Sequence, residues 1–232
     1  MSRSIAAELL LLALDEEKGK PVIDGSTLNA ALAGTAVVEL VAAGALDLQL
    51  EEGGEVKPGR LRRTGVARPT DPLLGEIVDT SHAKKPKDAI GALTTMTFTD
   101  RGAKLREQLL EELVADGVLT HERGKVLGLF PTNAWPEADP ADEAEVRERV
   151  RAVLVDGGQP DQRTAALVSM LSVTKLAPKV FPDLDRKQVQ ARADAVRETD
   201  WAGGAVAAAL DELMAVMMVT VFVPIIVSTS TS

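Results

Sequence analysis

The sequence predicts a mainly helical protein with an apolar helical core, amphipathic helices around that core and small β-hairpins at its edge. Apolar residues make up 45% of the 232 residues, whereas aromatic residues make up only 3%. The core must therefore be built from Leu, Val and Ala, which are mostly compatible with helices. Apolar runs and charged runs with helical spacing account for most of the chain, and two short segments alternate as strands do.

The first two helices are expected to be buried. Residues Ile5–Leu14 are nearly all apolar, and Leu28–Ala43 carry a single charged side chain, that of Glu39. Ser26 or Thr27 can cap the second helix through a side-chain oxygen. Because burying an unpaired carboxylate is costly, we expect Glu39 to reach the helix surface or to find a partner.

Short strands and further helices are expected after these two. Ala45–Leu50 alternates apolar and polar residues, and Arg60–Arg63 is expected to pair with it as a hairpin. Residues 71–93 predict two short helices joined by a turn. Three later helices are predicted, the first and last charged and the middle one apolar: Asp142–Asp156, Pro160–Leu171 and Asp183–Arg197.

The stretch Arg101–Phe130 is expected to organise the molecule as an amphipathic helix followed by a hairpin. Asp100 can cap the helix, and Gly117 can end it in the left-handed conformation. Residues 118–120 and 126–130 then read as two apolar strands around a charged turn at 121–125. The apolar face of the helix consists of four leucines: Leu105, Leu109, Leu110 and Leu113.

The end of the chain is strongly apolar. Residues 213–227 carry no charge, but the run is shorter than the roughly 20 residues that span a bilayer, and Pro224 interrupts it. The pattern favours a buried central helix, with a membrane-inserted tail as the alternative.

The residues and motifs of most enzyme classes are missing. The chain has no Cys, which removes disulfides, thiolate catalysis and Cys-based zinc sites. Its two histidines, His82 and His121, fall in predicted loops or turns, and no zinc-protease, serine-hydrolase, Walker or dinucleotide-binding pattern is present. The sequence therefore predicts a non-enzymatic protein without a cofactor or a metal ion.

The N-terminal run and the absence of Cys also indicate the cellular compartment. The N-terminal apolar run lacks a small-residue cleavage site, so no signal peptide is expected. A chain without Cys also fits a reducing compartment, and we expect a cytoplasmic protein.

The charge is uneven along the chain. The net charge is −9, which argues against a whole-surface polyanion binder. Residues 57–125 nevertheless hold 13 Lys/Arg against 10 Asp/Glu, whereas the remainder holds 13 against 25. An acidic body with a locally basic middle would bind anions through one patch only.

The basic residues near the start of the organising helix are the predicted anion site. Lys104 and Arg106 lie where the helix dipole is positive, and Arg106 can hold a phosphate through two hydrogen bonds. The alternative is that both make salt bridges with Glu107 or Glu111 on the same helix. The arginines of the earlier hairpin could add to the site: Arg60, Arg62 and Arg63.

The predicted hairpin after this helix is suited to a membrane surface. Val126, Leu127 and Leu129 could insert among acyl chains while Arg123 and Lys125 contact headgroups. The alternative is a hairpin folded onto the protein's own core.

Several stretches together resemble the Golgi phosphoprotein 3 family, in this order and spacing. They are residues 8–14 (ELLLLAL), 32–40 (LAGTAVVEL), 44–46 (GAL), 113–120 (LVADGVLT) with the hairpin that follows, and 161–163 (DQR) before an apolar helix. The alanine- and arginine-rich composition without Cys looks like that of a bacterial member.

The resemblance implies one mostly helical domain over residues 1–232, and a peripheral membrane protein like the eukaryotic members, which bind phosphatidylinositol 4-phosphate. The family's headgroup pocket uses a tryptophan and three arginines. The tryptophan position falls on Asp24, two arginine positions fall on Ala33 and Ala103, and the third matches Arg106. An acid at position 24 would repel a phosphate. The membrane-contacting hairpin of the family corresponds to residues 118–130.

Taken together, the residues and the resemblance predict a non-enzymatic peripheral protein at the inner face of a membrane. It would bind anionic phospholipid headgroups around Arg106 and Lys104, and protein partners or self-association are expected as in relatives. A protein-interaction adaptor without lipid binding is one alternative. A winged-helix-like DNA-binding protein is another, but its recognition helix would present acids to DNA, so no nucleic acid is expected.

Overall fold

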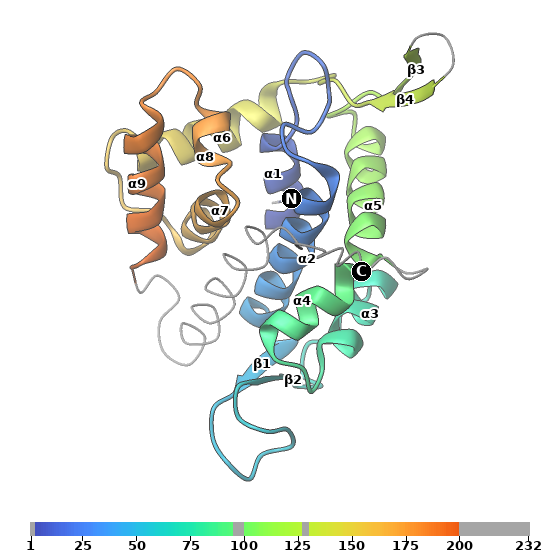
Figure 1. The fold of residues 1–232 in the computed structure, drawn as a ribbon, viewed down its shortest axis with the longest axis vertical. Helices are drawn as coiled ribbons and strands as arrows, with labels where there is room; N and C mark the ends of the chain where they lie inside the picture. The colour runs from blue at the N-terminus through green and yellow to red at the C-terminus, as the bar shows by residue number, and fades with distance from the viewer. Residues whose placement is uncertain (1–2, 95–99, 127–129, 200–232) are drawn as a thin grey trace, which may run out of the picture.

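The predicted mainly helical architecture is confirmed by the computed structural model, which describes residues 3–94, 100–126 and 130–199. The elements found within these ranges are nine helices and two antiparallel hairpins (Figure 1). In chain order they are α1 (Ile5–Leu12), α2 (Gly25–Ala42), β1 (Leu46–Gln49), β2 (Arg60–Arg63), α3 (Pro72–Ser81), α4 (Pro86–Thr94), α5 (Arg101–Ala115), β3 (Glu122–Val126), β4 (Phe130–Ala134), α6 (Ala141–Leu154), α7 (Gln162–Val173), α8 (Ala177–Val180) and α9 (Arg186–Arg197).

Helices α1 and α2 form the centre of the molecule. Helices α3, α4 and α5 pack on one side of this pair and α6 to α9 on the other (Figure 1). Every residue of α1 is buried, and one apolar cluster runs from Ile5 to Ala193. By length and composition α2 is also apolar enough to cross a bilayer, but 72% of it is buried inside this core, as expected for the core helix of a globular protein.

Helix α2 begins earlier than predicted, and Asp24 is its N-cap. The Asp24 carboxylate accepts from the Thr27 backbone N–H at 2.9 Å and from the hydroxyls of Ser26 and Thr27, each at 2.5 Å. Ser26 and Thr27, the predicted caps, therefore donate hydrogen bonds to Asp24, which caps the helix. These bonds, the one from Ser26 foremost, lower the pKa of Asp24 to about 2.

Glu39 finds a partner at the start of α1, as its apolar surroundings predicted. Its carboxylate accepts from the backbone N–H of Ile5 at 2.6 Å and of Ala6 at 3.2 Å. The first N–H groups of a helix have no partner within the helix, so Glu39 caps α1 from the side of α2. Burial nevertheless raises the pKa of Glu39.

Helix α5 has the predicted ends and lies very close to α2. Asp100 accepts from the Ala103 N–H at 2.9 Å, and Gly117 ends the helix with a φ of 76°. A Cβ on Gly102 would lie 2.5 Å from the backbone oxygen of Asn29, so only glycine allows this approach of the two helices. All four predicted leucines of α5 are buried: Leu105, Leu109, Leu110 and Leu113.

The second hairpin is displaced along the chain from its predicted position. Its strands pair Glu122 with Ala134 and Val126 with Phe130, so the segment predicted as a charged turn is strand β3. Val118 and Leu119, predicted as the first strand, are buried under the end of α5. An exposed two-stranded ribbon has no buried face to set its register, so the apolar pair joins the core and the hairpin forms beyond it.

The other helices predicted within the described residues are present with shifted ends, and the short α8 was not predicted. The first hairpin pairs Leu46 with Arg63 and Gln49 with Arg60, as expected. The apolar segment 213–227 lies outside the described residues.

Candidate anion-binding site

A hollow of about 710 Å³ lies between the outer side of α5 and the base of the β3–β4 hairpin. Helix α5 supplies seven lining residues, and the hairpin with its flanking residues supplies four. They are Ala103, Arg106, Glu107, Leu110, Glu111, Val114 and Ala115, together with His121, Arg123, Asn133 and Trp135.

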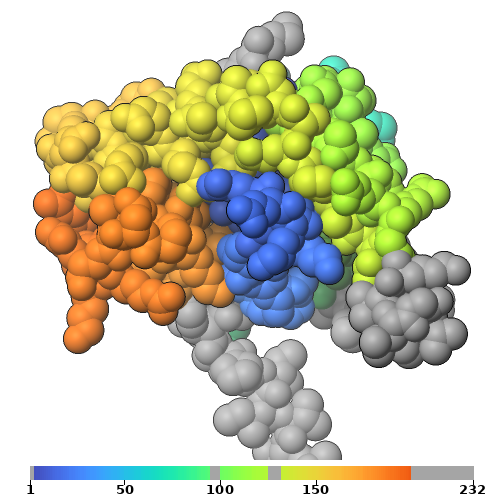
Figure 2. Space-filling model, turned by 90° about the horizontal axis from the view of Figure 1, so that it is seen from above, coloured from blue at the N-terminus to red at the C-terminus, as the bar shows by residue number. Residues whose placement is uncertain are grey.

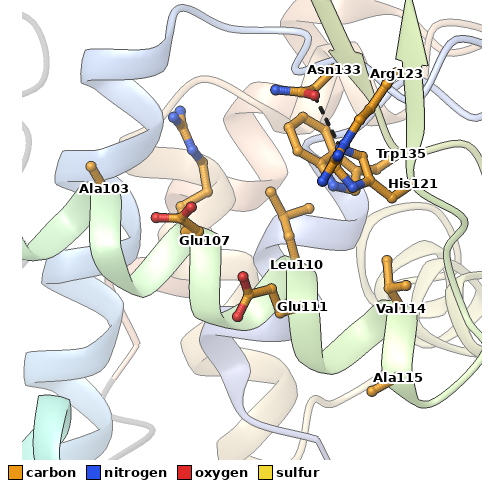
Figure 3. A pocket seen from close by; sticks show the side chains of 11 residues that line it. Ala103, Glu107, Leu110, Glu111, Val114, Ala115, His121, Arg123, Asn133 and Trp135 are labelled. Atoms are coloured by element: carbon orange, nitrogen blue, oxygen red, sulfur yellow. Dashed lines mark hydrogen bonds between the residues drawn. The ribbon is translucent and has the colours of Figure 1, made fainter.

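The hairpin side of the hollow is built around two stacked rings. The His121 and Trp135 rings have centroids 5.4 Å apart and planes within 6° of parallel (Figure 3). Nε2 of His121 lies 3.1 Å from Oδ1 of Asn133, and the backbone N–H of Trp135 donates to the backbone oxygen of Gly19 at 2.8 Å. This wall was not predicted, because His121 fell in the predicted charged turn at 121–125 and no role was predicted for Trp135. Two aromatic residues flanking the hairpin were the only signal.

The α5 side combines an apolar surface with two acids. Figure 3 shows Leu110 and Val114 beside the stacked rings and Glu107 and Glu111 along the same helix. Both glutamates are exposed. The hollow therefore offers apolar contact, hydrogen-bond acceptors and positive charge within one space.

The positive charge comes from two elements. Arg106 on α5 and Arg123 on β3 both line the hollow. Among the described residues, neither guanidinium makes a hydrogen bond or an ion pair, so the alternative in which Arg106 is held by Glu107 or Glu111 is not what the structure has. Two unpaired guanidinium groups can each give a phosphate two parallel hydrogen bonds.

The structure does not bring every predicted basic residue to this place. Lys104 is exposed and is not part of the lining; two residues along a helix correspond to a turn of about 200°, so it lies on the other side of α5 from Arg106. Lys125 and Val126 lie in β3. The predicted membrane-contacting residues Leu127 and Leu129 lie outside the described residues.

The arginines of the first hairpin are held elsewhere. Arg60 donates to the backbone oxygen of Ala83 at 2.6 Å, and Arg62 pairs with Asp47 at 2.8 Å. Arg63 pairs with Asp79 of α3 at 3.3 Å. This hairpin lies at the opposite end of the molecule from β3 and β4 (Figure 1), so the expectation that its arginines add to the site is wrong.

The pocket positions implied by the resemblance separate into two groups. Ala103 and Arg106 line the hollow, and Asp24 caps the helix whose first turn adjoins Arg106. Ala33 has no exposed surface, so that position cannot contact a ligand. Among the described residues, no group of three His, Asp or Glu side chains is placed to hold a metal ion.

A family model described as Golgi phosphoprotein 3 (GPP34) matches residues 5–213, nearly the whole chain. No curated protein matches the chain.

Proposed function

Because the chain belongs to the Golgi phosphoprotein 3 (GPP34) family, which is non-enzymatic, we propose that it is a peripheral membrane protein that binds anionic phospholipid headgroups in the hollow between α5 and the β3–β4 hairpin. The observation that carries this proposal is the pair Arg106 and Arg123. They come from different elements, line the same hollow and have no partner among the described residues.

The two acids of the hollow narrow the chemistry of the headgroup. Glu107 and Glu111 offset the charge of the two arginines, so the site attracts a ligand through direct contacts rather than through a strong net field. Carboxylates accept hydrogen bonds from hydroxyl groups. A headgroup that carries hydroxyls beside its phosphate, such as phosphatidylinositol 4-phosphate, uses both kinds of group.

The hairpin provides the second part of the proposal. Arg123 and Lys125 contact headgroups while Val126, Leu127 and Leu129 enter the acyl region, at the inner face of a cytoplasmic membrane. Each basic residue near an anionic surface contributes on the order of 1 kcal/mol. Binding by one copy is therefore weak and sensitive to salt, and self-association would strengthen it by multivalency.

Liposome co-sedimentation tests the proposal. Neutral vesicles are compared with vesicles that contain phosphatidylinositol, its 4-phosphate or phosphatidylserine at matched charge, at low and at physiological salt. Arg106→Ala is compared with Lys104→Ala, a matched variant that removes an exposed cation of the same helix outside the hollow. We expect binding to the 4-phosphate above the matched controls, and a loss of about fivefold or more in Arg106→Ala only.

Each of the other outcomes favours a different account of the protein. Equal losses in both variants would mean that general positive charge on α5, and not the hollow, carries the binding. Equal binding to all anionic vesicles would leave a docking protein without headgroup choice. No binding even at low salt would leave the protein-interaction adaptor, and a DNA mobility shift in that case would favour the winged-helix reading.

A further inference from the structure

A second group of basic side chains surrounds a groove of about 530 Å³ between α8 and α9. One carboxylate also lines the groove, that of Asp194, and it accepts hydrogen bonds from Ser172 at 2.5 Å and Gln190 at 2.7 Å. The four cations are Lys175, Lys179, Arg186 and Lys187.

The four cations of this groove are exposed. Lys179 donates to the backbone oxygen of Val22 at 2.8 Å, which uses one of three ammonium hydrogens. Arg186 and Lys187 make no hydrogen bond or ion pair within the described part of the chain.

The acids beside the groove are engaged with other groups. Asp183 pairs with Arg151 at 3.1 Å, and Asp185 caps α9 by accepting from the Gln188 N–H at 2.8 Å. The four cations outnumber these two acids and Asp194, which leaves a local positive charge in a chain whose net charge is −9 and favours an anionic partner here.

The groove lies on the same face of the protein as the β3–β4 hairpin. The loop of residues 15–22 connects the two regions, because Val22 accepts from Lys179 on one side and Gly19 accepts from the Trp135 N–H on the other. Figure 2 shows this loop, in blue, between the orange α8–α9 region and the yellow-green hairpin. The loop itself carries three acids against two lysines, so the positive charge of this face comes from the groove and from Arg123 and Lys125 of the hairpin.

We propose that the α8–α9 groove is a second contact with an anionic phospholipid bilayer, which holds the protein in one orientation together with the hairpin. This inference rests on the proposed membrane function. A flat, negatively charged surface can meet both regions at once because they lie on one face, whereas the headgroup hollow alone leaves the protein free to tilt. About fivefold in affinity is expected from each basic residue that approaches such a surface.

Charge reversal at the start of α9 tests the inference. The double variant Arg186→Glu, Lys187→Glu is compared with Lys85→Glu, Lys87→Glu, which reverses two exposed lysines at the start of α4. Acids are favourable near a helix N-terminus, so neither variant should lose stability. The turn before α4 contacts β2 through the Leu61 N–H to Lys84 oxygen bond, at the end of the molecule away from the hairpin (Figure 1).

The measurement is co-sedimentation with phosphatidylcholine vesicles with and without phosphatidylserine, with thermal melting as the fold control. We expect the α9 variant to bind the anionic vesicles at least about tenfold more weakly than wild type, and the α4 variant to lose less than about threefold. Equal losses would overturn the inference, since net charge alone would explain them. Wild-type affinity in the α9 variant would overturn it while leaving the proposed function in place. No binding by wild type would overturn both.

Discussion

The guanidinium of Arg106 lies against Gly25: one of its Nη atoms is 3.1 Å from where a Cβ on Gly25 would stand. The start of α2 therefore adjoins the hollow on α5. Asp24, the N-cap of α2, is the residue before Gly25 and carries a carboxylate at this place. Any anion bound by Arg106 comes close to that negative charge.

Neutralising Asp24 should strengthen anion binding. Asn keeps the N-cap bond from the Thr27 N–H through its one oxygen but loses the bond that the Thr27 hydroxyl donates to the second oxygen, so Asp24→Asn should lower the free energy of unfolding by about 1 kcal/mol. Removing the charge beside Arg106 should raise the affinity for anionic vesicles by about two- to fivefold. Vesicle titration and chemical denaturation check the two parts. Asp71→Asn, at the N-cap of α3, is the matched control. A gain of equal size in that variant would show that only net charge matters.

Removing the carboxylate of Glu8 should destabilise the fold. Glu8 is buried in α1 and lies 2.8 Å from Arg149 and 3.0 Å from Arg163, which are both partly buried. Glu8→Ala leaves two guanidinium groups without their shared partner, and we expect a loss of about 2–4 kcal/mol in the free energy of unfolding. Urea denaturation measures it. Glu148→Ala, on the exposed side of α6, should cost less than about 0.5 kcal/mol.

A methyl group at Gly19 should separate the loop before α2 from the hairpin. Gly19 has a φ of 58°, and its Cβ would lie 2.1 Å from the backbone of Trp135 and Pro136. Gly117 has a φ of 76° with nothing within 4 Å of its Cβ position. Both changes to Ala carry the cost of left-handed backbone, about 1 kcal/mol. Gly19→Ala should cost at least about 2 kcal/mol more, because backbone atoms must move. Equal unfolding free energies would show that the loop relaxes without loss.

Stability should fall as the pH rises through neutrality because of Glu143. Burial is the main cause that raises the pKa of Glu143 from 4.5 to about 8, and a hydrogen bond shared with the Glu137 carboxyl adds to it. Arg147 acts in the opposite direction. A carboxyl whose folded-state pKa is raised stabilises the fold below its unfolded pKa and loses that contribution up to its folded pKa. The decline therefore falls between about pH 4.5 and pH 8.

The variant Glu143→Gln isolates this effect. It cannot ionise, so its free energy of unfolding should decline less steeply over the same range, by up to about 1.4 kcal/mol per pH unit relative to wild type. Burial also raises the pKa of Glu39, which remains in the variant and leaves a residual decline of the same sign. Parallel pH profiles for variant and wild type would contradict the assignment to Glu143.

The helices were predictable where a local rule applied. Asp100 and Gly117 mark the ends of α5 through groups within a few residues of each, and the leucine spacing identified its buried face. The start of α2 was missed because three of the four residues there, 24 to 27, carry a side-chain oxygen that can cap a helix. Ser26 and Thr27 could each have been the cap, and only the hydrogen bonds show that they donate to Asp24.

The candidate site was only half predictable. Arg106 was identified from its place near a helix start, but Lys104 has the same local signal and lies away from the hollow. Trp135 and His121 meet across the hairpin, in a register that the predicted strands did not have. Pairing between exposed strands depends on the partner strand as well as on the segment itself, so the pattern of one segment could not locate the turn.

By itself, the sequence determined the helical class, the apolar core of Leu, Val and Ala, and the family, because these depend on composition, periodicity and the order of short stretches. Only the tertiary structure decided which charges meet. It buried Glu8 between Arg149 and Arg163, turned Glu39 toward the start of α1, and left Arg106 and Arg123 unpaired beside one hollow within the described residues. Such pairings join residues far apart in the chain, and Coulomb and hydrogen-bond energies depend on distance in space rather than on distance along the sequence.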